Sequence, residues 1–350
     1  MAPPTYPAGT TINDRYVFQR KLGSDGEVYE AFDRNLDKLV AVKLLDPLKG
    51  SPHTWHEAQR LEQLSSRCLI PVLNADVVIN SDIRFIVTPL VDGGDLESRA
   101  AGTGLSLQEA VRCARHIAAG IDRIHAEGMV HRDIKPANAL VSGDDDVMVS
   151  DLEMCEFLDS DGRAERNGSF CTVAPETAPD DGYCSVSSDI YSLGATAFYL
   201  LSGKYPIDHG LHPAEQRQRI VKGDIRDLRT LAPHVPRSVA IVVGKALKGA
   251  PDMRHGSAEE FGNALANAIN GKRDWKAMDH PGHLFCAEGE RFKGRAAVRI
   301  CAEPRADGGV NVVARLHPSG RRPSGVSDSV IQASQVPKKL RDLVSELNAD

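Results

Sequence analysis

The hydrophobic pattern of the chain changes twice along its length, and this order of patterns is the strongest constraint on its fold. From Arg15 to about Val91, β-branched and aromatic runs separated by Gly, Asp, Asn and Pro predict strands, and one helix-like stretch interrupts them at 55–64. From Ser106 to about Asn270, apolar residues recur at three- and four-residue steps, which is the period of helices. A strand-rich lobe followed by a helical lobe is therefore expected.

The end of the chain returns to strand-like patterns. Residues 296–302 and 310–316 resemble strands joined through Asp-Gly-Gly at 307–309, a hairpin signal, and an amphipathic helix follows. We predict a small α+β module over 272–350. This module carries 14 Lys and Arg against 10 Asp and Glu, a net charge of +4, whereas the net charge of the whole chain is −6.

Composition narrows the class of protein. Of the 350 residues, 41% are hydrophobic and 26% charged, and no run approaches the roughly 18 apolar residues that cross a bilayer. The seven cysteines are dispersed without a C-x-x-C pair, which is typical of reduced thiols. The start of the chain does not resemble a signal peptide, and residues 1–13 are expected to be flexible. We expect a cytoplasmic protein without a membrane segment.

The most informative string is HRDIKPANAL at 131–140, which follows a helix expected to end at Gly128. It brings a carboxylate (Asp133), an ammonium group (Lys135) and an amide (Asn138) into one loop. Phosphoryl transfer to a hydroxyl needs a carboxylate that orients the hydroxyl and accepts its proton, a cation near the γ-phosphoryl oxygens, and an oxygen ligand for magnesium. The string therefore predicts phosphoryl transfer.

This string resembles the catalytic loop H-R-D-L-x-x-x-N of the protein kinase superfamily, with Ile134 in place of Leu. Lys135 and the proline after it have the form seen in Ser/Thr kinases. Val-Ala-Val-Lys at 40–43 resembles the lysine-bearing strand of the family, which makes Lys43 the side chain that pairs with the α- and β-phosphates. Glu57, on the helix-like stretch, would hold Lys43 extended.

A second resemblance concerns the metal. Ser-Asp-Leu-Glu at 150–153 stands where the family carries Asp-Phe-Gly, and Glu153 departs from the glycine that is usual there. The resemblance implies Mg-ATP as the cofactor, with Mn²⁺ as a second metal that would fit. The implied metal ligands are Asn138 and Asp151.

A third resemblance covers the activation segment. Ala-Pro-Glu at 174–176 resembles the motif that closes this segment, and Ser169 takes the place of the threonine that contacts the catalytic Asp and Lys. Asp189 resembles the residue that holds the backbone of the catalytic loop. Arg254 stands where the family carries the partner of the glutamate at 176.

The phosphate-binding loop departs from the family pattern. KLGSDGEVYEA at 21–31 resembles the glycine-rich loop, but its glycines at 23 and 26 are closer together than the outer glycines of the family. A shorter tip offers fewer backbone N–H groups to the phosphates and should weaken ATP binding or slow turnover, and a tight β-turn at Asp25 is the alternative. By resemblance the nucleotide site comprises Leu22, Gly23, Gly26, Val28, Ala41, Lys43, Thr88, Val91, Leu140 and Asp151.

Together the motifs identify the chain as a member of the protein kinase superfamily with an α+β, two-lobed fold. The expected N-lobe covers 14–91 and the C-lobe 92–271. The implied function is a bacterial-type Ser/Thr kinase that transfers the γ-phosphoryl group of Mg-ATP to protein hydroxyls. The alternative is a catalytically impaired pseudokinase that serves as a nucleotide-binding scaffold or regulatory module. The implied catalytic residues are Asp133, Lys135, Asn138, Lys43 and Glu57.

The C-terminal module resembles no family that assigns its role. Its basic residues between Arg291 and Arg322 favour a solvated sheet face, with docking of an acidic or phosphorylated partner next and nucleic acid last. Four side chains able to bind a metal also lie here, namely His280, His283, Cys286 and Cys301. Their spacing fits no established pattern, so histidines of a hairpin and cysteines of the core are the favoured interpretation.

Overall fold

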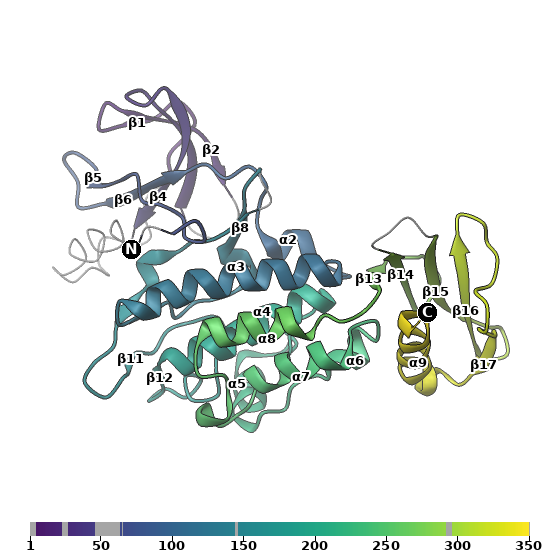
Figure 1. Ribbon diagram of the computed structural model, residues 1–350. Coiled ribbons are helices and arrows are strands. Elements are labelled where there is room, and N and C mark those ends of the chain that lie inside the picture. Colours follow the sequence, from purple (N-terminus) through teal and green to yellow (C-terminus); the bar gives the residue numbers. More distant parts are fainter. Residues whose placement is uncertain are drawn as a thin grey trace. The chain divides into compact units, whose positions relative to one another are not determined.

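The computed structural model of the chain describes residues 5–22, 27–45, 64, 66–143, 146–291 and 296–349 (Figure 1). The chain divides into two compact units. Met1–Gly94 and Leu140–Glu153 form the first unit, and Asp95–Ala139 and Met154–Asp350 form the second. The predicted order of a strand-rich part, a helical part and a final α+β part is confirmed.

The first unit is built on a six-stranded antiparallel sheet with the order β1-β2-β3-β4-β6-β5. Its strands are β1 (Thr11–Ile12), β2 (Tyr16–Leu22), β3 (Glu27–Asp33), β4 (Lys38–Leu45), β5 (Asn74–Val77) and β6 (Arg84–Pro89). Every second side chain of β3 and β4 is buried, because one face of the sheet lies on the core. The rings of Phe18 and Tyr29 stack in this core with their centroids 4.5 Å apart. The opposite face carries Val28, Ala41 and Lys43.

The beginning of the chain differs from the flexible segment expected over 1–13. Thr11 and Ile12 form β1 and pair with β2. The ring of Tyr6 meets that of Phe18 edge-on, with centroids 5.6 Å apart, and the Tyr6 backbone N–H donates to the Tyr29 hydroxyl at 3.1 Å. An aromatic side chain near the start of the chain thus covers the sheet core, which the proline-rich sequence there did not indicate.

The helical part of the second unit is organised around α3 and α4. Its helices are α2 (Leu96–Ala100), α3 (Leu107–Ala126), α4 (Val186–Ser202), α5 (Pro213–Lys222), α6 (Leu228–Leu231), α7 (Arg237–Ala246) and α8 (Ala258–Ala268). Ser106 begins α3 by accepting a hydrogen bond from the Glu109 N–H, and Gly128 follows its end with a φ of 72°. Nearly every residue of α4 is buried, as its apolar sequence predicted.

Short elements between these helices shape the loops of the site. They are β7 (Met129–Val130), η2 (Pro136–Asn138), β8 (Ala139–Val141), β9 (Val147–Val149), η3 (Leu152–Met154), β10 (Glu156–Phe157), β11 (Ala164–Glu165), β12 (Tyr183–Cys184) and, after α7, η4 (Pro251–Met253). β7 pairs with β10, β8 with β9, and β11 with β12.

The last part of the second unit is a five-stranded sheet with its strands in sequence order. They are β13 (Arg273–Met278), β14 (Phe285–Arg291), β15 (Ala297–Pro304), β16 (Val310–His317) and β17 (Ser329–Ile331), followed by η5 (Ala333–Gln335) and α9 (Val336–Ala349). The predicted hairpin is β15–β16, and the terminal helix α9 buries Leu340, Leu343 and Val344 against Trp275. The opposite face of the sheet holds a small cluster of Met278, Cys286, Cys301 and Val313.

Hydrogen bonds join this sheet and α9 to the helical part within the second unit. The Asp274 carboxylate accepts from the Gln108 N–H at 2.9 Å, at the start of α3, and the Arg341 guanidinium donates to the Arg229 carbonyl at 3.1 Å. Of the helices in the described residues, none combines the length and apolar content that a bilayer crossing requires.

Candidate active site

The side chains predicted to carry phosphoryl transfer fall into both compact units. Lys43 and Asp151 lie in the first unit, whereas Asp133, Lys135 and Asn138 lie in the second. The geometry of each group within its own unit follows.

Three side chains converge on the carboxylate of Asp133, which is 7% exposed. Lys135 Nζ donates to Oδ2 at 2.8 Å, and Ser169 Oγ donates to Oδ1 at 2.7 Å. Asn138 Nδ2 donates to Oδ2 at 3.1 Å and to the Asp133 carbonyl at 2.9 Å. Lys135 Nζ also donates to Ser169 Oγ at 3.0 Å, so Ser169 makes both of its expected contacts.

The electrostatics of this group keep Asp133 charged. Burial raises the pKa of Asp133, but the hydrogen bond and charge of Lys135, together with the Ser169 hydroxyl, outweigh burial and hold the pKa below its usual value. Asp133 is therefore an anion at neutral pH. A carboxylate with a low pKa is a weak base, which suits it to orient a hydroxyl and to take its proton late in the reaction.

The backbone around Asp133 is held by the buried Asp189 at the start of α4. The Asp189 carboxylate accepts from the N–H of His131 at 2.8 Å and from the N–H of Arg132 at 3.0 Å. These bonds hold Arg132 at a φ of 73°, in the left-handed region that non-glycine residues rarely adopt. The contact expected of Asp189 with the catalytic-loop backbone is present.

The side chain of Arg132 ties the catalytic loop to the end of η3 and to the segment that follows it. Its Nε donates to the Met154 carbonyl at 2.7 Å and its Nη1 to the Glu165 carbonyl at 3.2 Å. Its Nη2 lies 3.4 Å from the Glu156 carboxylate. An acidic side chain thus supplies a counter-charge to Arg132.

The end of this segment is anchored by a buried ion pair. Arg254 Nη1 and Nη2 donate to the two oxygens of Glu176 at 2.6 and 2.7 Å, a bidentate arrangement. The Arg254 guanidinium also donates to the carbonyls of Ser187 and Gly249 at 2.8 and 3.0 Å. The pairing of Arg254 with Glu176 was expected and is present.

The first unit carries its predicted residues on the sheet face away from the core. Val28 pairs with Lys43 across β3 and β4, and Ala41 pairs with Thr88 across β4 and β6. All four side chains are partly exposed. Because side chains one position apart along a strand point to opposite faces, this pairing brings the predicted apolar wall and Lys43 onto one surface.

Lys43 and Asp151 form an ion pair. Nζ of Lys43 lies 2.8 Å from Oδ1 of Asp151, and their side chains are 28% and 30% exposed. Asp151 adopts a φ of 61°, the left-handed conformation that Asp tolerates better than most residues.

The oxygen donors fit a magnesium ion. Mg²⁺ prefers carboxylate and carbonyl oxygens, and Asp151 offers a carboxylate. Since Nδ2 of Asn138 donates to Asp133, the amide is turned so that Oδ1 is the atom a metal would take. The side chains of both residues therefore have the chemistry that the metal requires.

Several predicted positions lie outside the described residues, namely Gly23, Gly26, Glu57 and the side chain of Glu153. Leu22 is described as the last residue of β2 and pairs with Val28. The shortened phosphate loop was predicted for positions that include 23–26, which lie outside the described residues, so it stays a prediction.

The structure adds residues that the motifs did not reveal. The N–H of Gly93 donates to the Val141 carbonyl at 3.0 Å, and the N–H of Val141 donates to the Gly94 carbonyl at 2.9 Å, which ties the segment after Val91 to the strand that carries Leu140. A β-carbon on Gly93 would lie 2.2 Å from the Val141 carbonyl oxygen, so only glycine fits. The Gly-Gly pair at 93–94 was the available signal for a close backbone approach.

A second residue that the motifs missed is His125. Its Nε2 lies 2.8 Å from the Asp189 carboxylate, beside the backbone groups that Asp189 binds. No local pattern pointed to it, because it lies on α3 and its partner begins α4.

Comparisons with known proteins agree with these motifs. The protein kinase domain family matches residues 16–264. The serine/threonine-protein kinase PknA of Mycobacterium tuberculosis is 30% identical over 289 residues, a match that covers 78% of this chain and 65% of PknA. PrkC of Bacillus subtilis is 30% identical over 276 residues, covering 76% of this chain and 42% of PrkC. The chain thus spans less than two thirds of the length of these relatives.

The family match covers most of the chain, includes the catalytic loop and the ion pair of the first unit, and agrees with the order of a strand-rich and a helical part. The chain therefore belongs to the protein kinase family.

Proposed function

We propose that this protein transfers the γ-phosphoryl group of Mg-ATP to Ser and Thr hydroxyls of protein substrates. The observation that carries the proposal is the Asp133 carboxylate, which is buried and contacted by Lys135, Ser169 and Asn138. A carboxylate so placed can orient one hydroxyl and accept its proton. The names of the relatives, which are serine/threonine-protein kinases, support the same class of acceptor.

The other polar residues have separate tasks. Lys135, between Asp133 and Ser169, would steady the γ-phosphoryl group, and Lys43 with Glu57 would position the α- and β-phosphates. Asn138 and Asp151 would hold Mg²⁺, or Mn²⁺, which binds the same oxygen ligands. The metal, when bound, neutralises charge on the phosphates.

The nucleotide would bind the sheet face of the first unit. Pro89 has no N–H, so the backbone of Val91 would have to donate to adenine. The residues proposed to line the nucleotide site are Leu22, Gly23, Gly26, Val28, Ala41, Lys43, Thr88, Val91, Leu140 and Asp151.

We place the kinase domain at 14–271, with lobes at 14–91 and 92–271, and the C-terminal module at 272–350, since β13 begins at Arg273. All seven cysteines are free thiols, which is typical of the cytoplasm, the compartment that we propose. Docking of an acidic partner on the module stays a prediction. Four of the module's arginines are already ion-paired, namely Arg299, Arg305, Arg315 and Arg322.

The test is phosphoryl transfer from γ-labelled ATP to the protein itself and to a generic protein substrate. Asp133→Asn removes the orienting carboxylate and Lys43→Met the phosphate contact, so both variants should lose label. The matched controls Asp224→Asn and Lys222→Met change exposed residues and should keep it.

Label retained by both active-site variants would contradict the proposal. Nucleotide binding by the unmodified protein without any transfer would favour the pseudokinase alternative instead. Phosphoamino-acid analysis of the product identifies the acceptor hydroxyl.

A further inference from the structure

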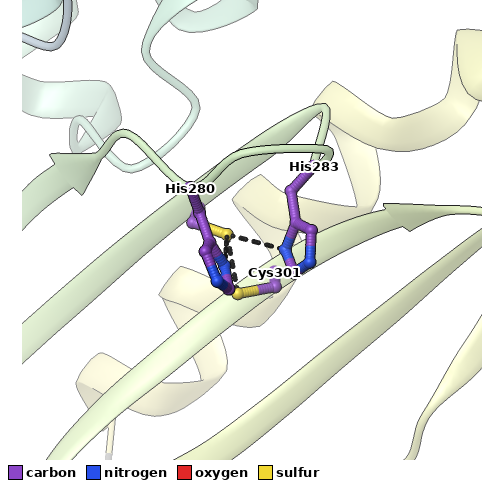
Figure 2. A group of neighbouring side chains, drawn as sticks. His280, His283 and Cys301 are labelled. Atoms are coloured by element: carbon purple, nitrogen blue, oxygen red, sulfur yellow. Dashed lines mark hydrogen bonds between the residues drawn. The ribbon is translucent and has the colours of Figure 1, made fainter.

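Four side chains of the C-terminal module converge at one end of its sheet. They lie more than a hundred residues after the catalytic loop in the sequence. We call them the His2Cys2 cluster: His280, His283, Cys286 and Cys301. Their ligand atoms all lie within 4.8 Å of one another. Figure 2 shows the rings of His280 and His283 and the side chain of Cys301 directed toward one another. None of the four has a role in the proposed kinase reaction.

The two histidines are placed by a tight turn between β13 and β14. The N–H of His283 donates to the His280 carbonyl at 3.1 Å, and Gly282 has a φ of 83°. Pro281 and Gly282 thus occupy the central positions of a type II turn, for which proline and glycine are the favoured residues. The turn brings the two imidazoles to a centroid distance of 4.0 Å.

The two cysteines are placed by strand pairing. Cys286 on β14 and Cys301 on β15 are direct cross-strand partners, and both side chains point to the face opposite α9. They are 1% and 5% exposed, whereas His280 is exposed and His283 half-buried. The histidine turn therefore closes over a buried pair of sulfur atoms.

The nitrogen–sulfur distances within the cluster are close to those around a tetrahedral metal. Nδ1 of His283 and Nδ1 of His280 lie 3.2 and 3.5 Å from Sγ of Cys286. Around zinc, with Zn–S near 2.3 Å and Zn–N near 2.0–2.1 Å, ligand atoms lie roughly 3.3–3.8 Å apart. The two sulfur atoms are 2.7 Å apart, so they would separate by about 1 Å when a metal enters.

We propose that the His2Cys2 cluster binds one Zn²⁺ ion. Two thiolates and two imidazoles form a ligand set that selects borderline-soft divalent ions over Mg²⁺ and Ca²⁺, which take oxygen ligands. Four protein ligands leave no open coordination position, which makes the site structural and not catalytic. The ion would pin the β13–β14 turn onto the sheet face that α9 leaves uncovered.

Metal analysis and Co²⁺ reconstitution of the full chain, purified under reducing conditions, test the proposal. About one zinc ion per chain is expected, and Co²⁺ should give thiolate charge-transfer absorption with the intense visible bands of a tetrahedral site. His280→Ala changes an exposed ligand and Cys301→Ser a buried one, and each should weaken metal binding by roughly tenfold or more.

The matched controls are His209→Ala, an exposed histidine of the helical part, and Cys68→Ser, a half-buried cysteine of the first unit. Both should bind zinc like the unmodified chain. The Co²⁺ spectrum is measured on the unmodified chain, so it still tests the proposal if Cys301→Ser fails to fold. Absence of tetrahedral Co²⁺ bands, a zinc affinity unchanged by His280→Ala in competition with a chelator, or a Cys286–Cys301 disulfide in the protein purified under reducing conditions would each overturn the proposal.

Discussion

Asp133 is the residue at which burial and hydrogen bonding oppose each other most clearly. Burial alone would raise its pKa, and the contacts from Lys135 and Ser169 reverse the sign. The motif predicted which residue is the carboxylate, because a loop of this kind is local in sequence. Its pKa is lowered by Lys135 first and also by Ser169, which lies in a different loop and was assigned only by resemblance.

Ser169→Ala tests this balance. Loss of one hydrogen bond to the carboxylate should raise the pKa of Asp133, so the acid limb of the kcat/KM profile should move to higher pH. A hydrogen bond to a charged group contributes about 1.5–3 kcal/mol, so kcat/KM should fall roughly tenfold or more. Ser160→Ala, an exposed serine of the same segment, is the control. If the acid limb of Ser169→Ala stays at the same pH, the Ser169 hydroxyl does not lower the pKa of Asp133.

The ion pair of Arg254 and Glu176 is the second test at this scale. Its side chains are 0% and 10% exposed, so Glu176→Ala leaves a buried guanidinium without its partner and should lower the free energy of unfolding by about 3–5 kcal/mol. The matched control is Glu215→Ala, whose pair with Arg219 is 45% and 43% exposed and should cost at most about 1 kcal/mol. Urea denaturation of both variants measures the difference, and equal losses would refute the structural role of the pair.

At the scale of elements, α4 and α5 end in the same way but in different surroundings. Gly203 after α4 and Gly223 after α5 have φ values of 67° and 66°. A β-carbon at Gly203 would lie 2.6–2.7 Å from backbone atoms of 102–104, whereas nothing lies within 4 Å of one at Gly223. Alanine at Gly223 therefore tests the free-energy cost of the left-handed conformation alone, whereas alanine at Gly203 adds the cost of a close backbone contact.

Gly223→Ala should lower the free energy of unfolding by about 1 kcal/mol, since only the left-handed conformation opposes alanine there. Gly203→Ala should lose distinctly more, because the neighbouring backbone has to move. The midpoints of urea denaturation compare the two variants directly. Similar midpoints would mean that the backbone at 102–104 moves away from the added β-carbon with little loss of stability, contrary to the prediction.

At the scale of the whole molecule, His234 joins the helical part of the second unit to the C-terminal module. It follows α6, and its ring stacks on Phe285 of β14 with centroids 5.9 Å apart. It is 1% exposed, and among the described residues neither ring nitrogen has a hydrogen-bond partner. Burial lowers the pKa of His234 from 6.5 to about 4.

This predicts a pH-dependent stability. Above pH 6.5 the ring is neutral in both folded and unfolded chains, but between pH 6.5 and about 4 only the unfolded chain binds the proton, so stability falls with falling pH. The full loss is about 3 kcal/mol, at 1.36 kcal/mol per pKa unit. Between pH 7.5 and pH 5, the free energy of unfolding should decrease less in His234→Leu than in the unmodified chain, as measured by urea denaturation at both pH values. His209→Leu, which changes an exposed histidine, is the control and should lose as much stability as the unmodified chain. If His234→Leu also loses as much, buried His234 is not the source of the pH dependence.

The sequence by itself determined the α+β class, the central buried helix α4, the hairpin β15–β16 and the polar residues of the catalytic loop. Hydrophobic period and short motifs are local properties, so they can be read without the fold. The tertiary structure alone decided that His125 contacts Asp189 and that only glycine fits at position 93. It also decided that the His2Cys2 cluster converges. Each of these depends on strand register and on packing between segments distant in the chain, which residue spacing does not encode.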